Sequence, residues 1–358
     1  MSEHETDRAP GLAHPRETYD LIGHESAERA VASAMAQGRL HHAWLITGPK
    51  GVGKATFAYR MARVLLGGER LSPHTLAVSP EDPVARRIAA LGHADLRILR
   101  RPWDDKTGKA KADIPVDEAR RLGEFFALTA GEGGARVAIV DTGDDLNRNA
   151  ANALLKTLEE PPPRGVMILL AHAPGALLAT IRSRCSVLRL APLDPDAAIK
   201  AIRARTDLDP PDARLLADLS AGAIGQALSL AACGGAALYR ELVSSLAVDR
   251  PGLPTVRRIA SEAGKRGEET RFHLTFHFLR DWLARAMKAS AGLDLTPRVE
   301  EEAKGLARAA TAAPKAWAQA FAEVSAIEQE TDALTMDRTA AVYAAFEAIG
   351  RANRSARA

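Results

Sequence analysis

The chain has 358 residues, of which 46% are hydrophobic and 26% charged, proportions typical of a globular protein with two or three domains. Its two cysteines, Cys185 and Cys233, exclude a disulfide framework and a four-cysteine zinc site. The net charge of +3 permits contact with nucleic acid without predicting it. The polar first residues do not resemble a signal peptide, and no apolar run approaches the roughly 18 residues of a membrane helix, so we expect a cytoplasmic protein.

Short apolar runs alternate with helical patterns through the first half of the sequence. The runs are AWLIT (43–47), RILR (97–100), RVAIV (136–140), MILLAH (167–172) and SVLRL (186–190). Apolar runs separated by helices are typical of a parallel sheet with helices on both faces. The polar segment PWDDKTGKAKAD (102–113) interrupts this pattern, and we expect it to form a hairpin or a loop.

After Leu190 the sequence has only helical patterns. A helix is predicted to begin at the Asp-Pro of DPDAAIKAIRAR, from residue 194. Two apolar stripes at helical spacing follow, and they consist of Phe272, Phe276, Leu279 and Leu283, and of Trp317, Phe321 and Val324. We therefore predict an α/β domain over residues 1–192, a small helical domain over 193–237 and an all-α domain over 238–358.

The segment GPKGVGKAT (48–56) has the pattern of a phosphate-binding loop between a predicted strand and a predicted helix. Glycines there let backbone N–H groups turn toward phosphate oxygens at a helix N-terminus, and Lys54 reaches the β- and γ-phosphates. The next position normally supplies a hydroxyl to Mg²⁺, but it is Ala55. Thr56 is displaced by about 100° around the helix, so it is not a simple replacement.

A second half-site is predicted where RVAIVD ends at Asp141, a carboxylate that could hold a metal-bound water. A hydrolytic site usually has Glu at the next position, which is Thr142 here. Asp144 and Asp145 have the wrong spacing and suit a helix start. We therefore expect no appreciable ATP hydrolysis, and the sequence leaves open whether ATP or ADP is bound weakly or not at all. The candidate nucleotide-binding residues are Gly48, Gly51, Gly53, Lys54, Thr56 and Asp141.

The sequence resembles the clamp-loader branch of the AAA+ superfamily. The specific motifs are NALLKTLEEPP (152–162) and the tripeptide SRC (183–185), and LIGHESA (21–27) is similar to an N-terminal box of the family. The similarity runs from about residue 20 to residue 240, and beyond that the chain agrees only in being helical. The resemblance implies a P-loop AAA+ domain, a helical lid and a helical collar that mediates oligomerisation.

Within this family the chain is most similar to the delta-prime type of the bacterial DNA polymerase III clamp loader. Motor subunits of the gamma/tau type have Ser or Thr at position 55, Glu at 142 and an Arg in the lid, where this chain has Ala55, Thr142 and Gly225. A catalytically active, gamma/tau-like ATPase in which Thr56 or Asp144 rescues the site is the alternative. Family members usually carry a four-cysteine zinc module, but residues 67–92 contain no cysteine, so we predict no zinc and no other metal.

The resemblance implies that Arg184 of the SRC motif crosses a subunit interface to ATP bound by a neighbouring gamma/tau subunit. A guanidinium there neutralises the charge that develops in phosphoryl transfer. The alternative is a surface arginine, or one paired with Glu159 or Glu160. The implied assembly is a hetero-pentamer with gamma/tau and delta that loads a sliding clamp onto primer–template DNA. The side chain of Arg148 either contacts a phosphate of this DNA or lies on a solvent-exposed helix face. This chain would be an ATPase-inactive subunit of that polymerase assembly, without polymerase activity of its own.

Overall fold

The structure is a computed structural model that describes residues 5–131, 134–247 and 253–355. These residues form two compact units. One unit runs to Asp207 and includes Ser220–Ser229, and the other comprises Leu208–Leu219 and the residues from Leu230 onward. The domain boundaries expected after residues 192 and 237 stay predictions.

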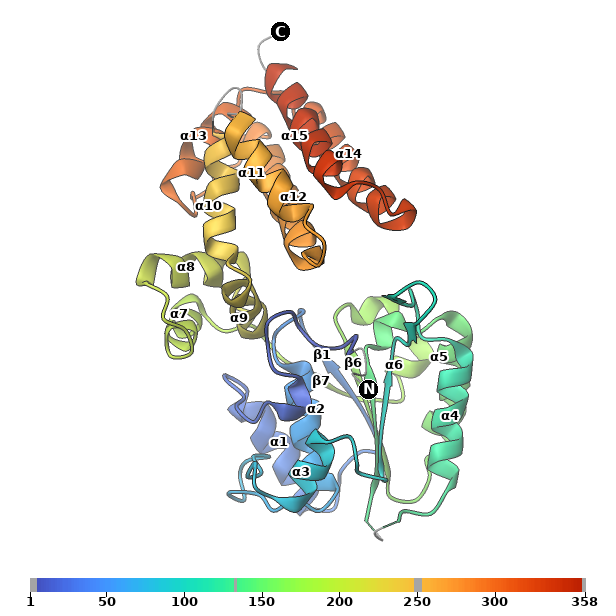
Figure 1. Cartoon of the computed structure of the whole chain (residues 1–358). Helices are drawn as coiled ribbons and strands as arrows, with labels where there is room; N and C mark the ends of the chain where they lie inside the picture. The colour runs from blue at the N-terminus through green and yellow to red at the C-terminus, as the bar shows by residue number, and fades with distance from the viewer. Residues whose placement is uncertain (1–4, 132–133, 248–252, 356–358) are drawn as a thin grey trace. The chain divides into compact units, whose positions relative to one another are not determined.

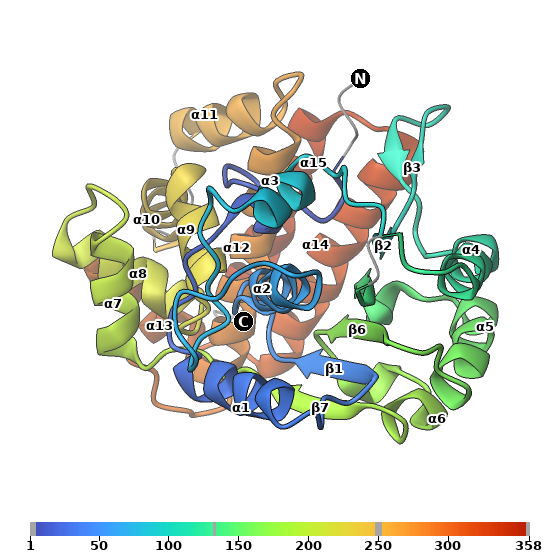
Figure 2. The same ribbon diagram turned by 90° about the horizontal axis from the view of Figure 1, so that it is seen from below.

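The first unit is built on a five-stranded parallel sheet with the order β2-β5-β6-β1-β7. Figure 2 shows β6, β1 and β7 side by side. Every residue of β1 and β6 is buried, which explains why these two strands are continuous apolar runs in the sequence. All five predicted strands are confirmed, and their bounds are β1 Ala43–Thr47, β2 Leu96–Arg100, β5 Arg136–Asp141, β6 Gly165–Ala171 and β7 Ser186–Arg189.

Helices cover both faces of this sheet, as predicted (Figure 1). Each face of the sheet has its own hydrophobic core, and successive side chains of β1 enter these cores alternately. Ile46 packs with Phe57 on one face, and Leu45 packs with Leu154 on the other. The helices are α1 Glu25–Ala36, α2 Lys54–Leu65 and α3 Pro83–Ala89 on the first face, and α4 Val116–Ala127, α5 Arg148–Glu159 and α6 Ala179–Arg182 on the second.

Shorter elements complete the first unit. The predicted hairpin is confirmed, because β3 Trp103–Asp104 pairs antiparallel with β4 Lys109–Ala110. Three 3-10 turns and one further α-helix lie in the connections, with the bounds η1 Pro15–Glu17, η2 Gly143–Asp145, η3 Pro174–Ala176 and α7 Pro195–Arg203. Helix α9, Ile224–Ala232, begins within the first unit and ends in the second.

All the secondary-structure elements in the described residues of the second unit are helices, which confirms the prediction for this half of the chain. Its core contains the first apolar stripe, since Phe272, Phe276 and Leu279 are fully buried, and Trp317 packs edge-on against Trp282. The helices are α8 Pro210–Leu219, α10 Gly235–Leu246, α11 Leu253–Ala263, α12 Glu269–Ser290, α13 Glu300–Ala309, α14 Pro314–Leu334 and α15 Arg338–Ser355. None of the described helices is long and apolar enough to cross a membrane.

Candidate nucleotide site

The loop between β1 and α2 has the backbone geometry that the glycine pattern predicts. Gly48, Gly51 and Gly53 have φ angles of +149°, +78° and +107°, which side-chain-bearing residues rarely adopt. A Cβ on Gly48 would lie 2.4 Å from the backbone oxygen of Leu190. Helix α2 begins at Lys54, so the loop leads directly into a helix N-terminus, where backbone N–H groups favour a phosphate.

The side chain of Lys54 is held by the loop itself. Its Nζ donates hydrogen bonds to the backbone oxygens of Gly48, at 2.7 Å, and Pro49, at 2.8 Å. Burial lowers the pKa of Lys54 to about 8, although the negative charges of Asp141 and Asp144 oppose that shift. Contact between Lys54 and a phosphate therefore requires the ammonium to exchange two carbonyl partners for phosphate oxygens.

Helix α9 begins directly against the phosphate loop. The backbone N–H of Gly225 donates to the oxygen of Gly51 at 2.8 Å. A Cβ on Gly225 would lie 2.8 Å from that same oxygen, and a Cβ on Gly51 would lie 2.5 Å from the backbone nitrogen of Gln226. The lid position where motor subunits are expected to carry an arginine is thus a close backbone contact in this chain.

The position that normally supplies a hydroxyl to Mg²⁺ is apolar in this chain. Ala55 is partly buried and packs against the core cluster that contains Ile46 and Phe57. Thr56 is also partly buried, one position further around α2. The loop therefore keeps the backbone that fits phosphate, but its side chains do not fit the usual coordination of the metal.

Asp141 ends β5 beside the loop, as expected. Burial raises the pKa of Asp141 to about 7, the negative charge of Asp7 adds to that rise, and Lys54 opposes it. The next residue, Thr142, is buried. A carboxylate that is easily protonated near neutral pH is a poor partner for a metal-bound water.

The two acids that follow have structural partners. Asp144 accepts hydrogen bonds from the backbone N–H groups of His172, at 2.5 Å, and Ala173, at 3.0 Å, so it fixes the chain where β6 ends. Asp145 pairs with Arg101 at 3.2 Å. His172 follows β6, and the pKa of its imidazole is lowered by desolvation and by the positive charge of Lys54, so it lies close to the site.

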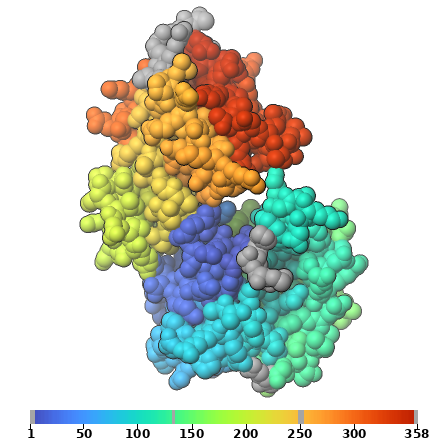
Figure 3. Space-filling view, in the orientation of Figure 1, coloured from blue at the N-terminus to red at the C-terminus, as the bar shows by residue number. Residues whose placement is uncertain are grey.

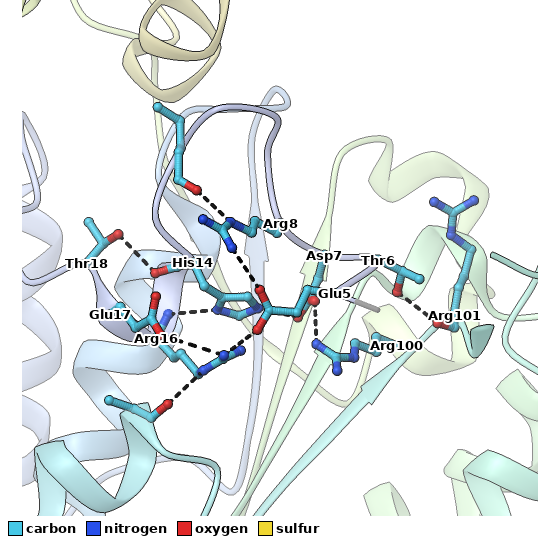
Figure 4. A network of polar contacts seen from close by, with 12 residues as sticks. Glu5, Thr6, Asp7, Arg8, His14, Arg16, Glu17, Thr18, Arg100 and Arg101 are labelled. Atoms are coloured by element: carbon cyan, nitrogen blue, oxygen red, sulfur yellow. Dashed lines mark hydrogen bonds and ion pairs between the residues drawn. The ribbon is translucent and has the colours of Figure 1, made fainter. Parts of the chain in front are cut away.

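Sequence reasoning missed the segment over residues 5–19, which we call the N-terminal arm. Figure 4 shows its polar contacts. The buried carboxylate of Asp7 binds Arg100 at 2.6 Å and lies 3.2 Å from Nε2 of His14. Arg100 is the register partner of Asp141, so this network adjoins the candidate site.

The arm also contacts α9, because the Ser229 hydroxyl donates to the backbone oxygen of Pro10 at 2.7 Å. The N-terminal part of the chain, in blue, lies at the surface of the first unit in Figure 3. Thus the arm connects the end of β2 with the helix that packs on the phosphate loop. The sequence shows the acidic residues of the arm together with His14 and Arg16. These polar residues have no helical or strand periodicity, so they do not predict that the segment packs on the domain.

Arg184 lies at the surface between α6 and β7, where its contacts are with α5 and α6. Its guanidinium binds Glu159 through Nη2 at 2.8 Å and the backbone oxygen of Thr180 through Nη1 at 3.0 Å. The side chain of Arg184 is 36% exposed and that of Glu159 is 49% exposed. The sequence left open a finger in trans on one side, and on the other a surface arginine or one paired with Glu159 or Glu160.

Potential metal ligands were sought over residues 5–131, 134–247 and 253–355. Among the residues that the structure describes, no group of three or more His, Cys, Asp and Glu side chains is placed to hold a metal ion. The expectation that the chain binds no zinc stays a prediction.

The parallel sheet and the phosphate loop define a P-loop α/β unit, and the described secondary structure of the second unit is helical, which is the combination that the resemblance to AAA+ proteins implies. Residues 23–194 match the family model described as DNA polymerase III, delta subunit. A delta-prime subunit of DNA polymerase III from Pseudomonas aeruginosa is 38% identical over 48% of this chain and 49% of its own length. The predicted resemblance to delta-prime subunits is therefore confirmed.

A delta-prime subunit and a tau subunit from Escherichia coli are also similar to the chain. The Escherichia coli delta-prime subunit is 36% identical over 57% of this chain and 58% of its own length. The E. coli tau subunit is 30% identical over 60% of this chain and 32% of its own length. The chain spans about half the length of the delta-prime relatives it matches. A gamma subunit-related protein from Thermotoga maritima, at 16% identity, has a TM-score of 0.38 over 88% of this chain and 95% of its own.

Proposed function

We propose that this chain is a delta-prime-type subunit of a DNA polymerase III clamp loader. In this role it does not turn over ATP itself, and it supplies Arg184 to the nucleotide site of a neighbouring gamma/tau subunit. The family match and the delta-prime and tau relatives support the assignment to a clamp loader. The remaining partners are a delta subunit, a sliding clamp and primer–template DNA bound by the assembled complex.

The observation that carries the proposal is the state of the chain's own nucleotide site. The site lacks a hydroxyl at Ala55 and a glutamate at Thr142, and Asp144 is occupied by two backbone N–H groups. Hydrolysis needs a side chain that binds the metal and a group that orients the attacking water, and this chain has neither side chain at the usual position. An exposed arginine in an otherwise silent subunit can still act on a neighbour's nucleotide.

The second candidate function is an active ATPase of the gamma/tau type. Its best support is the intact phosphate loop, whose glycines adopt the expected φ angles directly before α2. Measuring ATP turnover by the purified chain separates the two functions. Turnover at a rate typical of motor subunits, abolished by Lys54→Ala, would overturn the first proposal.

The loop backbone fits the phosphates of ATP or ADP, so we propose weak nucleotide binding without hydrolysis. The N–H groups at the start of α2 and Lys54 would hold the phosphates, and Thr56 and Asp141 lie beside them. Calorimetry with ATP and ADP should detect binding to the wild type that Lys54→Ala removes. Identical heats from both proteins would refute a phosphate site at this loop.

In the proposed assembly, Arg184 acts on the partner's nucleotide through charge. Its guanidinium would offset negative charge on the γ-phosphate as the bond to the leaving oxygen breaks. An arginine supplied in trans to such a site accelerates phosphoryl transfer by roughly 10³–10⁵-fold. A lysine should not replace it fully, because the planar fork of arginine binds two phosphate oxygens at once.

The decisive experiment compares Arg184→Ala with Arg189→Ala in a loader reconstituted with gamma/tau and delta. Arg189 is an exposed arginine on β7, five positions along the chain, and serves as the matched control. We expect Arg184→Ala to lose most of the ATPase activity stimulated by the clamp and DNA, with assembly intact and the control unchanged. Full activity in both variants would reduce Arg184 to a structural residue.

A further inference from the structure

We infer that Glu159 is a positioning residue for Arg184, which holds the guanidinium at the surface until phosphates of a neighbour's nucleotide compete for it. The inference rests on the proposed function, since it concerns the regulation of the same arginine. Its basis is the ion pair between Arg184 Nη2 and Glu159 Oε1, at 2.8 Å.

Two elements of the fold define the position of the guanidinium. Glu159 is the last residue of α5, and Arg184 follows α6 directly before β7. Nη1 of Arg184 is bound by the backbone oxygen of Thr180, so one edge of the guanidinium contacts α6 while Nη2 contacts α5. This geometry removes most of the rotamer freedom that a long surface arginine would otherwise have.

The pair is suited to a reversible role because both partners are exposed. Solvent screens exposed ion pairs strongly, so releasing Arg184 from Glu159 costs little. A triphosphate carries more negative charge than one carboxylate and offers arginine a bidentate partner. The guanidinium should therefore move to the phosphates when a neighbouring subunit presents them, and return to Glu159 when they leave.

The chain offers a matched control at the next position. Glu160 is exposed, like Glu159, and its backbone N–H caps the end of α5 by donating to the oxygen of Lys156. A change of Glu160 to Gln keeps that backbone bond and removes the same charge from the same surface. Glu159→Gln and Glu160→Gln therefore differ in whether the lost charge is bonded to Arg184.

The test measures ATP turnover of the reconstituted loader as a function of ATP concentration, with clamp and primer–template DNA present. With Glu159→Gln, we expect the KM for ATP to fall by ~2–5-fold, the factor expected for releasing one exposed ion pair. The kcat should stay unchanged, because the arginine reaches the same position once bound. Glu160→Gln should match the wild type, and size-exclusion chromatography should show intact assembly for both variants.

The same comparison in an Arg184→Ala background separates the possible causes. If Glu159 acts through Arg184, Glu159→Gln has no effect on the KM in that background. A KM shift that persists there, or wild-type kinetics for Glu159→Gln alone, overturns this inference while the proposed function stands. Full activity of Arg184→Ala itself overturns both.

Discussion

Replacing Asp141 with asparagine should stabilise the first unit, and the size of the gain should depend on pH. Burial raises the pKa of Asp141 to about 7, whereas an aspartate in an unfolded chain has a pKa of about 4. The folded state therefore disfavours the charged carboxylate. Asparagine has nearly the same shape and stays neutral, so it avoids this cost.

The magnitude follows from the difference in pKa between the two states. A shift of about three units corresponds to ~4 kcal/mol at 1.36 kcal/mol per unit. Asp141 is only partly buried, so solvent screening reduces this to about 2 kcal/mol. Because the pKa of Asp141 is higher in the folded state than in the unfolded state, its contribution to wild-type stability declines between about pH 4 and pH 7 and is constant above that range.

The assay is thermal unfolding of the wild type and Asp141→Asn at several pH values from 4 to 8. Asp196→Asn, an exposed aspartate on α7, serves as the control. The Asp141→Asn midpoint should equal that of the wild type near pH 4 and exceed it by about 4–8 °C at pH 8. A difference that is constant across pH, or a less stable variant at pH 8, would refute the reasoning about this carboxylate.

Three further predictions concern the surroundings of the site. Burial opposes ionisation of Asp7, but His14 and Arg100 hold its pKa below the ordinary value, so the stabilisation by Asp7 is present above about pH 4 and is lost as the pH falls through the folded pKa. Asp7→Asn should cost about 1–3 kcal/mol in urea unfolding at pH 7 and less in acid, and an equal cost at both pH values would contradict this. Gly51→Ala should lower the unfolding midpoint by the equivalent of about 1–3 kcal/mol, because Gly51 has a φ of +78° and a Cβ on it would lie 2.5 Å from a backbone nitrogen of α9. An unchanged midpoint would mean that α9 does not pack against the phosphate loop. Burial raises the pKa of Cys185 to about 11, so labelling with a thiol reagent at pH 8, followed by mass spectrometry, should be slow in the native protein and fast in urea, and fast native labelling would show an accessible thiolate.

The sheet could be predicted from the sequence because its strands are buried on both faces. Buried parallel strands read as uninterrupted apolar runs, and all five runs became strands within two residues of the expected bounds. The phosphate loop was predictable for a related reason, since the φ angles at Gly48, Gly51 and Gly53 demand glycine.

The contacts around the site could not be predicted in the same way. The substitution at Gly225 was visible in the sequence, but its bond to Gly51 depends on how α9 approaches the loop. The pairing of Arg184 with Glu159 rather than Glu160 depends on where α5 ends relative to α6. Such contacts join distant parts of the chain, and they follow from tertiary geometry, which no local pattern encodes.

The strand order has a consequence for the synthesis of this protein. The first strand to be made, β1, pairs with β6 and β7, which are the last strands of the sheet to leave the ribosome. Its five residues, all buried in the folded protein, therefore have no partner strand until residues 165–189 have been translated. A nascent chain that stalls before that point exposes a largely apolar, unpaired strand, which is a hazard for aggregation. The segment that completes the pairing of β1 also carries the SRC motif, so the strand that leads into the phosphate loop gains its last partner only after Arg184 has been made.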